Sequence, residues 1–442
     1  MKSTIDCLVA NAQEALKSFS AYSQEQVDHI VESMVAAGVA NAERLGQMAY
    51  EETLMGVVGH KVAKNMAATQ VVGDYLRDKK SVGVIGEEDG VIQIAEPFGV
   101  IAALTPTTNP TSTILFKAII ALKGRNTVVF AFHPRGQQCG VEAARLMLNA
   151  AVEAGAPKNC IQWIAEPSVE ATSYLIKHPG TSLILATGGK AMVHASYTSG
   201  HPAYGVGPGN VPAYIEKSAN LEQTTDNIIL SKTFDNGVIC ASEQNLIFDD
   251  QKIADATLEK FKEKGAYIVN EEEKAKLAEA MFDQEKNIPV LDVVGRSAAK
   301  VAEFAGFRVP EETTVILVPL DDIGAGDLLS GEKLSPVLGY VVVDSREKAI
   351  QLACEMLEFK GAGHSAAIHT CDDKAFEEYA LAVPAGRILM NQPSVLGAVG
   401  GEYNNLLPTF TLGCGARGGN STSDNIQYFH LLNIKRAAKP KN

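Results

Sequence analysis

The segment Ser231–Asn245, with the sequence SKTFDNGVICASEQN, places one cysteine, Cys240, between two different patterns. The residues before Asp235 have helical periodicity, whereas Leu246–Phe248 favour a strand. Between them, Asp235-Asn236-Gly237 is a sequence typical of a turn, because Asn and Gly tolerate positive φ. A cysteine beside such a turn can expose its sulfur to a cleft, and the thiolate is the reactive form. A lone cysteine next to Val and Ile is more often a small buried hydrophobe, so other segments must decide between these interpretations.

The composition is that of an ordinary globular protein. The chain has 442 residues, of which 46% are hydrophobic and 21% are charged. This length suggests two domains, with room for a small appendage. A net charge of -13 argues against a nucleic-acid partner and offers no basic patch for a membrane. No apolar run approaches the ~20 residues that span a bilayer, and the N-terminus lacks a signal-peptide core, so we expect a cytoplasmic protein.

The cysteines are odd in number, widely scattered and without a C-x-x-C pair. This usage fits reduced thiols and predicts no metal site. The seven positions are Cys7, Cys139, Cys160, Cys240, Cys354, Cys371 and Cys414.

The N-terminal part of the chain changes from a helical to a strand pattern. Residues 5–75 favour helices, one of which begins with a capping box formed by Ser23 and Gln26. Residues 82–96 change to period two around a turn at Asp89-Gly90, which predicts a hairpin. Such a hairpin would pair with another part of the chain or with another subunit.

From Gly99 to Glu216, short apolar strands alternate with helices, which predicts a parallel sheet covered on both faces. The expected strands are 100–104, 127–132, 161–164, 183–186 and 211–215, and the expected helices are 110–123, 137–154, 167–177 and 190–199. Ligands of such sheets bind at the carboxyl ends of strands, where Thr105–Pro110 and Thr187–Lys190 form polar loops. The fingerprint G-x-G-x-x-G is missing from the head of this unit, so we do not expect an ordinary Rossmann domain.

A second α/β unit is expected from about Ser218 to Asn391, and it contains Cys240. Its further expected strands are 314–318, 338–343 and 365–369, and its expected helices are 251–264, 273–281 and 346–358. Residues 392–425 are rich in Gly, Asn, Ser and Thr, and Phe429–Ile434 favours a last strand.

Five motifs, taken in their order and spacing, resemble those of the aldehyde dehydrogenase superfamily, over essentially the whole chain. They are Thr105-Pro-x-x-Asn-Pro110, Thr187-Gly-Gly189, Gly205-Val-Gly-Pro-Gly-Asn210, Asn236-Gly-Val-Ile-Cys240 and Glu332-Lys-Leu-Ser-Pro336. More narrowly, the chain resembles the CoA-acylating branch. That branch includes the acetaldehyde dehydrogenase half of bifunctional aldehyde-alcohol dehydrogenases and the CoA-dependent succinate-semialdehyde dehydrogenases.

The resemblance implies an α/β, aldehyde dehydrogenase-like architecture with two parallel-sheet domains and an oligomerisation flap. Residues 1–81 and 98–216 would form the dinucleotide-binding domain, and residues 217–404 the catalytic domain. Residues 82–97 and 405–442 would form the flap, which implies a homodimer or tetramer.

For the chemistry, the resemblance implies that the Cys240 thiolate attacks an aldehyde carbon. The side-chain amide of Asn109 and the backbone N–H of Cys240 would stabilise the oxyanion. Hydride transfer to NAD or NADP would then leave a thioester on the cysteine. The alternative for Asn109 is a turn residue that holds the Asn-Pro bend.

The fate of the thioester distinguishes two branches of the family. Hydrolytic relatives carry a glutamate base just before a Leu-Gly-Gly turn, whereas the corresponding Tyr204–Asn210 has no acidic residue. Without a base, water attacks slowly and the thiol of coenzyme A is the better nucleophile. Glu243 is expected to be a structural hydrogen-bond partner rather than a substitute base. His364 either helps to deprotonate the CoA thiol or hydrogen-bonds within the core, and both interpretations stay open.

For the cofactor, the resemblance implies contacts from three loops and from Glu332, the glutamate expected at the nicotinamide ribose. A solvated loop carboxylate is the alternative for Glu332. Arg135 could accept a 2′-phosphate, so both NAD and NADP stay open. The expected cofactor residues are Thr105, Pro106, Thr107, His133, Pro134, Arg135, Thr187, Gly188, Gly189, Gly207 and Glu332.

On the substrate side, the expected residues are Ile239 and Arg417. Relatives usually carry tryptophan at the position of Arg417, and a guanidinium there suits a carboxylate or sulfonate. We therefore expect a short anionic aldehyde, such as succinate semialdehyde or sulfoacetaldehyde. If Arg417 is a surface residue, acetaldehyde or propionaldehyde is favoured instead. Reduction of an acyl phosphate and an inactive scaffold are the alternative functions.

Overall fold

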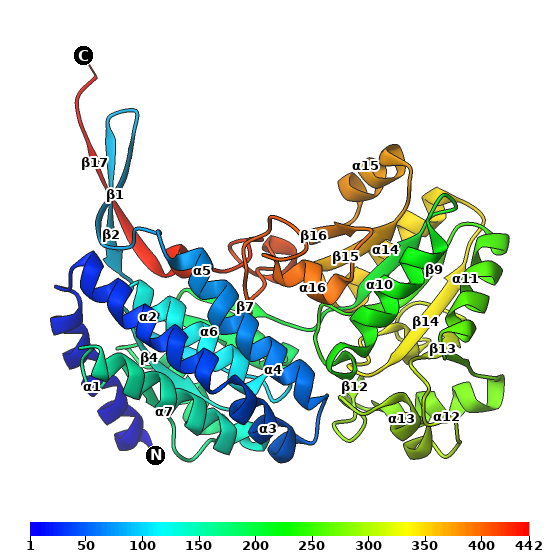
Figure 1. Ribbon diagram of the computed structural model, residues 1–442, viewed down its shortest axis with the longest axis horizontal. Helices are drawn as coiled ribbons and strands as arrows, with labels where there is room; N and C mark the ends of the chain where they lie inside the picture. Colours follow the sequence, from blue (N-terminus) through cyan, green and yellow to red (C-terminus); the bar gives the residue numbers. More distant parts are fainter. Residues whose placement is uncertain (442) are drawn as a thin grey trace.

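The computed structural model describes residues 1–441. Two α/β lobes lie side by side, and an antiparallel flap projects from the N-terminal lobe (Figure 1). The expected fold class is confirmed. Within residues 1–441, no helix has both the length and the apolar character needed to cross a bilayer.

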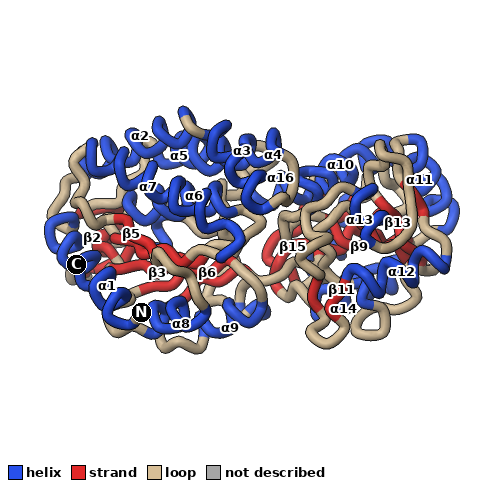
Figure 2. The backbone as a smooth tube through the Cα atoms, turned by 90° about the horizontal axis from the view of Figure 1, so that it is seen from below, coloured by secondary structure: helices blue, strands red, loops and turns tan. Residues whose placement is uncertain are grey.

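The first lobe contains a five-stranded parallel sheet in the order β5-β4-β3-β6-β7. Its strands are β3 (Val100–Leu104), β4 (Thr127–Ala131), β5 (Ile161–Trp163), β6 (Leu183–Thr187) and β7 (Ala203–Val206). Helices cover both faces, with α1, α8 and α9 on one side and α2, α6 and α7 on the other (Figure 2). These helices are α1 (Lys2–Phe19), α2 (Gln24–Ala40), α3 (Ala42–Thr53), α4 (Val58–Met66), α5 (Val72–Leu76), α6 (Pro110–Lys123), α7 (Gln137–Glu153), α8 (Val169–Lys177) and α9 (Lys190–Tyr197).

Helix α6 is buried along its whole length, and its only charged residue away from its C-terminus, Lys117, lies inside the lobe. The Lys117 ammonium donates to the backbone oxygens of Leu104 at 2.7 Å and Leu185 at 2.9 Å, and to the Thr187 hydroxyl at 3.0 Å. Since Leu104 and Thr187 end β3 and β6, this one side chain ties together the carboxyl ends of two neighbouring strands. The two polar loops that follow these strands are thereby held at one edge of the sheet.

The second lobe contains a seven-stranded parallel sheet in the order β10-β13-β14-β9-β8-β15-β16. Its strands are β8 (Val211–Ile215), β9 (Glu243–Phe248), β10 (Tyr267–Ile268), β13 (Ile316–Pro319), β14 (Val337–Val342), β15 (Gly363–His369) and β16 (Ala385–Met390). Its helices are α10 (Leu221–Thr233), α11 (Gln251–Glu263), α12 (Glu271–Met281), α13 (Ala298–Phe304), α14 (Arg346–Phe359), α15 (Asp373–Ala382) and α16 (Ser394–Val399). A short hairpin, β11 (Phe282–Asp283) and β12 (Ile288–Pro289), lies outside the sheet.

One strand belongs to a different sheet than its sequence neighbourhood indicates. Val211–Ile215, placed in the first unit by the strand–helix alternation, pairs with β9 and β15 of the second sheet. The change of sheet therefore falls between β7 and β8 and not at residue 216. The strand–helix alternation is misleading here because a buried parallel strand has the same apolar sequence in either sheet.

The flap is a three-stranded antiparallel sheet of β1 (Gly83–Glu88), β2 (Val91–Pro97) and β17 (Leu432–Ala438). The expected hairpin is confirmed, and its turn has φ values of 49° at Asp89 and 76° at Gly90. The expectation that all of 405–442 builds the flap is wrong, because within residues 1–441 the pairing with the hairpin begins at Leu432, in β17. The last strand also begins later than expected, since Tyr428–Leu431 forms a 3₁₀ turn before it.

Candidate active site

Cys240 follows a turn of three consecutive residues with left-handed backbone. The φ values are 51° at Asp235, 53° at Asn236 and 69° at Gly237. Such φ values are unfavourable for residues other than glycine, so contacts outside the turn must hold them. The Asp235 carboxylate accepts the backbone N–H of Val57 at 2.7 Å, and the Asn236 amide donates to the Gly295 oxygen at 3.0 Å. Loops of both lobes thus fix the turn that presents the cysteine.

The sulfur of Cys240 lies 3.2 Å from Nε2 of His364, at the start of β15. Burial, with the nearby Arg387 charge, lowers the pKa of His364 to about 3. Burial also raises the pKa of the Cys240 thiol above its ordinary value, and Glu332 adds to this effect. Both shifts favour a neutral thiol beside a neutral imidazole. The structure brings together two residues that the sequence analysis singled out separately.

The glycine-rich loop before β8 packs directly against this pair. A Cβ atom added to Gly209 would lie 2.2 Å from the Cys240 carbonyl oxygen and 3.0 Å from a ring carbon of His364. Only glycine fits at this position, and the loop itself places no carboxylate beside the sulfur. The backbone N–H of Gly209 instead donates to Glu332 at 2.8 Å.

Glu332 is buried, with 6% of its surface exposed, so the solvated alternative is wrong for this residue. Burial raises the pKa of Glu332 to about 7. Glu243 is also buried, and its carboxylate accepts the backbone N–H of Ser394 at 3.0 Å, as expected for a structural partner. Of the two carboxylates, Glu332 is the one held by the loop that covers Cys240.

Asn109 is the N-cap residue of α6, in the first lobe. Its Oδ1 atom accepts from the Lys64 ammonium at 2.6 Å, and its Nδ2 atom donates to the Thr108 hydroxyl at 3.2 Å. Lys64 is also paired with Asp235, so Asn109 is connected to the cysteine turn through one buried side chain. The sequence analysis missed Lys61 and Lys64, because charged residues one turn apart on a helix ordinarily indicate a solvated face.

The loops expected to hold a dinucleotide are polar and in part open. The Thr107 hydroxyl is buried without a hydrogen-bond partner within residues 1–441. A Cβ atom added to Gly189 or Gly207 would meet no atom within 4 Å, so space adjoins both backbones. These features fit a ligand that approaches the ends of β3 and β6, where Thr105, Pro106 and Gly188 also lie.

Arg135 lies elsewhere in the same region, in a 3₁₀ turn after β4 that includes Pro134. Its guanidinium lies 3.9 Å from the Asp292 carboxylate of the second lobe, and its backbone N–H donates to His133 at 3.2 Å. Both side chains of this pair are largely exposed, Arg135 to 50% and Asp292 to 65%. A pair this long and exposed is weak, so the Arg135 guanidinium stays accessible and both NAD and NADP remain open.

The two expected substrate residues differ in their surroundings. Ile239, adjacent to Cys240, is buried in an apolar cluster with Met55, Val238 and Leu412. Arg417 is exposed in a short 3₁₀ turn, and its side chain forms no hydrogen bond or ion pair to another residue within 1–441.

Arg387 is a buried residue of the site that the sequence analysis missed. Its guanidinium donates to the backbone oxygens of His364 at 2.7 Å and Gly413 at 2.6 Å. It also donates to the Ser423 oxygen at 3.1 Å and to the Asn425 side chain at 3.2 Å. One side chain of β16 thus joins the start of β15 to the segment 413–425. The signal in the sequence that could have identified Arg387 is an arginine inside an otherwise apolar strand pattern.

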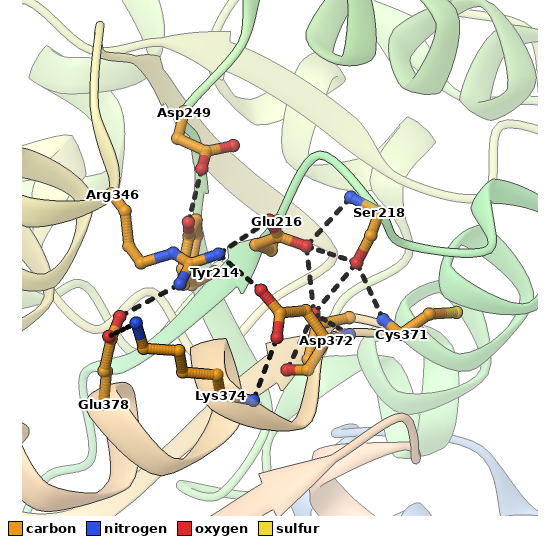
Figure 3. Close-up of polar contacts among 10 residues, drawn as sticks. Tyr214, Glu216, Ser218, Asp249, Arg346, Cys371, Asp372, Lys374 and Glu378 are labelled. Carbon is orange, nitrogen blue, oxygen red and sulfur yellow. Dashed lines mark hydrogen bonds and ion pairs between the residues drawn. The ribbon is translucent and has the colours of Figure 1, made fainter.

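A second polar cluster lies at the opposite edge of the second sheet, beyond the carboxyl ends of β8, β9 and β15 (Figure 3). There Arg346 pairs with Glu216 at 3.2 Å, Asp372 at 2.8 Å and Glu378 at 3.0 Å. Cys240 and His364 instead lie at the amino ends of β9 and β15. The described part of the chain contains no group of His, Cys, Asp and Glu side chains suited to a metal ion.

The family model described as "Aldehyde dehydrogenase family" matches residues 1–403 of this chain. The chain is 47% identical over 451 residues to "Aldehyde-alcohol dehydrogenase 2" of Entamoeba histolytica, covering 99% of this chain and 52% of that protein. It is 38% identical over 432 residues to "Succinate-semialdehyde dehydrogenase (acetylating)" of Clostridium kluyveri, covering 97% and 94%.

Solved structures agree with these matches. An acetylating aldehyde dehydrogenase from Geobacillus thermoglucosidasius has a TM-score of 0.96 and 44% identity, covering 100% of this chain and 97% of that one. A propionaldehyde dehydrogenase from Rhodopseudomonas palustris, solved with bound CoA and an acylated cysteine, has a TM-score of 0.87 and 27% identity, covering 98% and 97%. The chain therefore belongs to the aldehyde dehydrogenase family. It spans about half the length of the aldehyde-alcohol dehydrogenases that it matches.

Proposed function

We propose that this protein is a CoA-acylating aldehyde dehydrogenase, which converts an aldehyde, CoA and NAD(P)+ into an acyl-CoA, NAD(P)H and a proton. The observation that carries the proposal is the contact of 3.2 Å between the Cys240 sulfur and His364, beneath a loop whose Gly209 leaves no room for a side chain. The names of two similar proteins include the word acetylating, and a third was solved with CoA and an acylated cysteine.

In the first half-reaction, the Cys240 sulfur forms a bond to the aldehyde carbon and releases its proton, for which Nε2 of His364 is the adjacent acceptor. The carbonyl oxygen becomes an oxyanion, which the Asn109 amide and the Cys240 backbone N–H would stabilise. A bound nicotinamide would accept the hydride as the carbonyl re-forms, leaving a thioester on Cys240. Thr105, Thr107, Thr187, Gly188, Gly189, Gly207 and Glu332 are the residues that would hold that cofactor.

In the second half-reaction, the CoA sulfur attacks the thioester carbon and the Cys240 thiolate leaves. The contact of His364 with the Cys240 sulfur supports a role in deprotonating the CoA thiol over a purely structural one. Water is disfavoured as the acceptor because the loop against Cys240 carries no acidic residue. Glu243, the carboxylate nearest to Cys240 in sequence, is held by Ser394.

The test is a steady-state assay with NAD+ or NADP+ and a panel of acetaldehyde, propionaldehyde, succinate semialdehyde and sulfoacetaldehyde, with and without CoA. Without CoA, we expect at most one rapid burst of NAD(P)H per active site; with CoA, turnover continues and the product is a thioester. Free acid released at the same rate without CoA would contradict the acylating assignment. Turnover that requires phosphate but not CoA would instead support an acyl-phosphate reductase.

For the substrate, we propose a short anionic aldehyde, as the guanidinium of Arg417 suggests. A similar protein is named for succinate semialdehyde. In the same panel, the anionic aldehydes should then have the higher kcat/KM. Higher values for acetaldehyde or propionaldehyde would favour the neutral alternative.

We also propose that the flap mediates assembly into a homodimer or tetramer. Its three strands extend away from both lobes (Figure 1), and residues along β1 are partly or fully exposed. Light scattering on the purified protein tests this, because a monomer at micromolar concentration would contradict it.

A further inference from the structure

A buried cluster of charges lies where the first lobe meets the cysteine turn. Lys61 and Lys64, one turn apart on α4, are 2% and 3% exposed, and Asp235 is fully buried. The ammonium of Lys61 lies 3.3 Å from Oδ2 of Asp235, and Lys64 contacts the same oxygen. Two buried cations thus share one carboxylate, which leaves an excess positive charge at this position.

The two lysines differ in one contact. Lys64 donates to Oδ1 of Asn109 at 2.6 Å. Both ammonium groups reach the backbone oxygen of Thr108, at 3.5 Å from Lys61 and 3.4 Å from Lys64, but Lys61 forms no hydrogen bond to Asn109. Both lysines contact Asp235, Lys64 more closely than Lys61, and the bond to Asn109 is the hydrogen bond that Lys64 alone forms.

That bond determines which way the Asn109 amide faces. An ammonium group has three donors and no acceptor, so the amide must turn its oxygen toward Lys64. The NH2 group is thereby directed away from Lys64. Its one hydrogen bond within residues 1–441 goes to the Thr108 hydroxyl at 3.2 Å, so one N–H remains for a substrate oxygen. Without Lys64, the amide can rotate and present an acceptor in place of a donor.

The charge of Lys64 acts in the same direction. Burial, with the neighbouring Lys61 charge, lowers the pKa of Lys64 to about 8, while Asp235 opposes the shift. Lys64 is therefore mostly protonated at neutral pH. A cation bound to the amide oxygen polarises the N–H groups, and a fixed donor in a dry site stabilises developing negative charge strongly.

We infer that Lys64 is a positioning residue, which fixes the Asn109 amide with its N–H directed at the oxyanion formed on the aldehyde. This inference rests on the proposed function. Replacing Lys61 provides a matched control, because the substitution also removes a positive charge beside Asp235 but leaves the contacts of Asn109 unchanged.

The experiment is a double-mutant cycle that combines Lys64→Met with Asn109→Ala, measured as the rate of the first NAD(P)H burst with the best aldehyde of the panel. We expect Lys64→Met to slow the burst by about ten- to a hundredfold, and Lys61→Met by less than about threefold. In the Asn109→Ala background, Lys64→Met should slow the burst further by less than about threefold. The Kd for NAD(P)+ should stay within about threefold in every variant.

A second readout separates the amide from the cysteine turn. Alkylation of Cys240 by iodoacetamide requires no oxyanion donor, so Lys64→Met should leave its rate within about threefold of the unsubstituted protein. A large loss of alkylation, equal losses for both lysine variants, or an additive effect in the Asn109→Ala background would overturn the inference. If Asn109→Ala leaves the burst rate unchanged, both the proposed oxyanion site and the inference about Lys64 are wrong. If Lys64→Met does not fold, Lys64→Gln enters the same cycle under the same criteria.

Discussion

The sulfur of Cys240 lies 3.2 Å from Nε2 of His364, although 124 positions separate the two residues in the chain. The contact forms because β9 and β15 are both neighbours of β8, and both residues lie at the amino ends of their strands. The first lobe contributes its loops from the carboxyl edge of its own sheet. The candidate site is therefore built from opposite edges of two parallel sheets.

Replacing Cys240, the proposed nucleophile, should stop the proposed reaction without unfolding the protein. We expect Cys240→Ser to lower acyl transfer by on the order of a thousandfold or more, since a serine hydroxyl has no strong base beside it. NAD(P)+ binding and the Tm should change little. Cys160→Ser, at a buried cysteine outside the site, is the control that should retain turnover. A Cys240→Ser enzyme with most of its activity would disprove the mechanism.

The Cys240–His364 contact also predicts a pH dependence. Because the pKa of the thiol is raised and that of the imidazole is lowered to about 3, the pair is neutral at pH 6 to 8. The thiolate fraction should rise roughly tenfold per pH unit over this range. Mass spectrometry of the Cys240 peptide after timed iodoacetamide treatment measures the rate. A plateau already present at pH 6 would indicate a thiolate–imidazolium pair instead.

Gly209 should not tolerate any side chain. A methyl group would lie 2.2 Å from the Cys240 oxygen, so Gly209→Ala must displace the cysteine loop. We expect a loss of unfolding free energy of about 1–3 kcal/mol and little remaining turnover. Gly207→Ala is the stability control, because no atom lies within 4 Å of its new methyl group. Denaturant unfolding curves that do not distinguish the two variants would refute this packing.

The buried Glu332 carboxylate is expected to lower the stability of the fold while it contributes to cofactor binding. Because its folded pKa is raised to about 7, the folded state holds the proton more tightly than the unfolded state, and stability falls as pH rises from about 4.5 to 7. Glu332→Gln removes this loss. The variant should gain on the order of 3 kcal/mol at most above pH 7 and nothing below pH 4.5.

The same substitution should weaken NAD(P)+ binding, because the carboxylate expected at the ribose is gone. Unfolding curves at pH 5 and pH 8, together with a cofactor titration, measure both effects. Equal stability changes at the two pH values would show that the carboxylate is not titrating in this range.

Arg417 tests the substrate proposal. If its guanidinium binds the distal anion of the aldehyde, Arg417→Trp should lower kcat/KM for succinate semialdehyde by ten- to a hundredfold, the loss of one charge-assisted hydrogen bond of ~1.5–3 kcal/mol. Acetaldehyde turnover should be spared. Equal losses on both aldehydes, or none on either, would leave Arg417 as a surface residue, in keeping with its exposure.

The alternating apolar runs predicted most of the strands and helices, and α6 was expected at its observed bounds, 110–123. The sequence analysis also singled out Cys240 and His364, which the structure brings into contact. Periodicity could not identify the buried charges, because Lys64 is enclosed by pairing with Asp235, 171 positions away. Nor could it assign Val211–Ile215 to the correct sheet, since that depends on β9 and β15.

The contacts of Arg387 have a consequence for the order in which the candidate site assembles. Proteins are synthesised from the N-terminus, and lobes begin to fold as they leave the ribosome. The guanidinium that supports His364 also requires Gly413, Ser423 and Asn425. A nascent chain of which only the first 400 residues have left the ribosome therefore carries Cys240, the proposed nucleophile, before the segment that Arg387 joins to His364 is available.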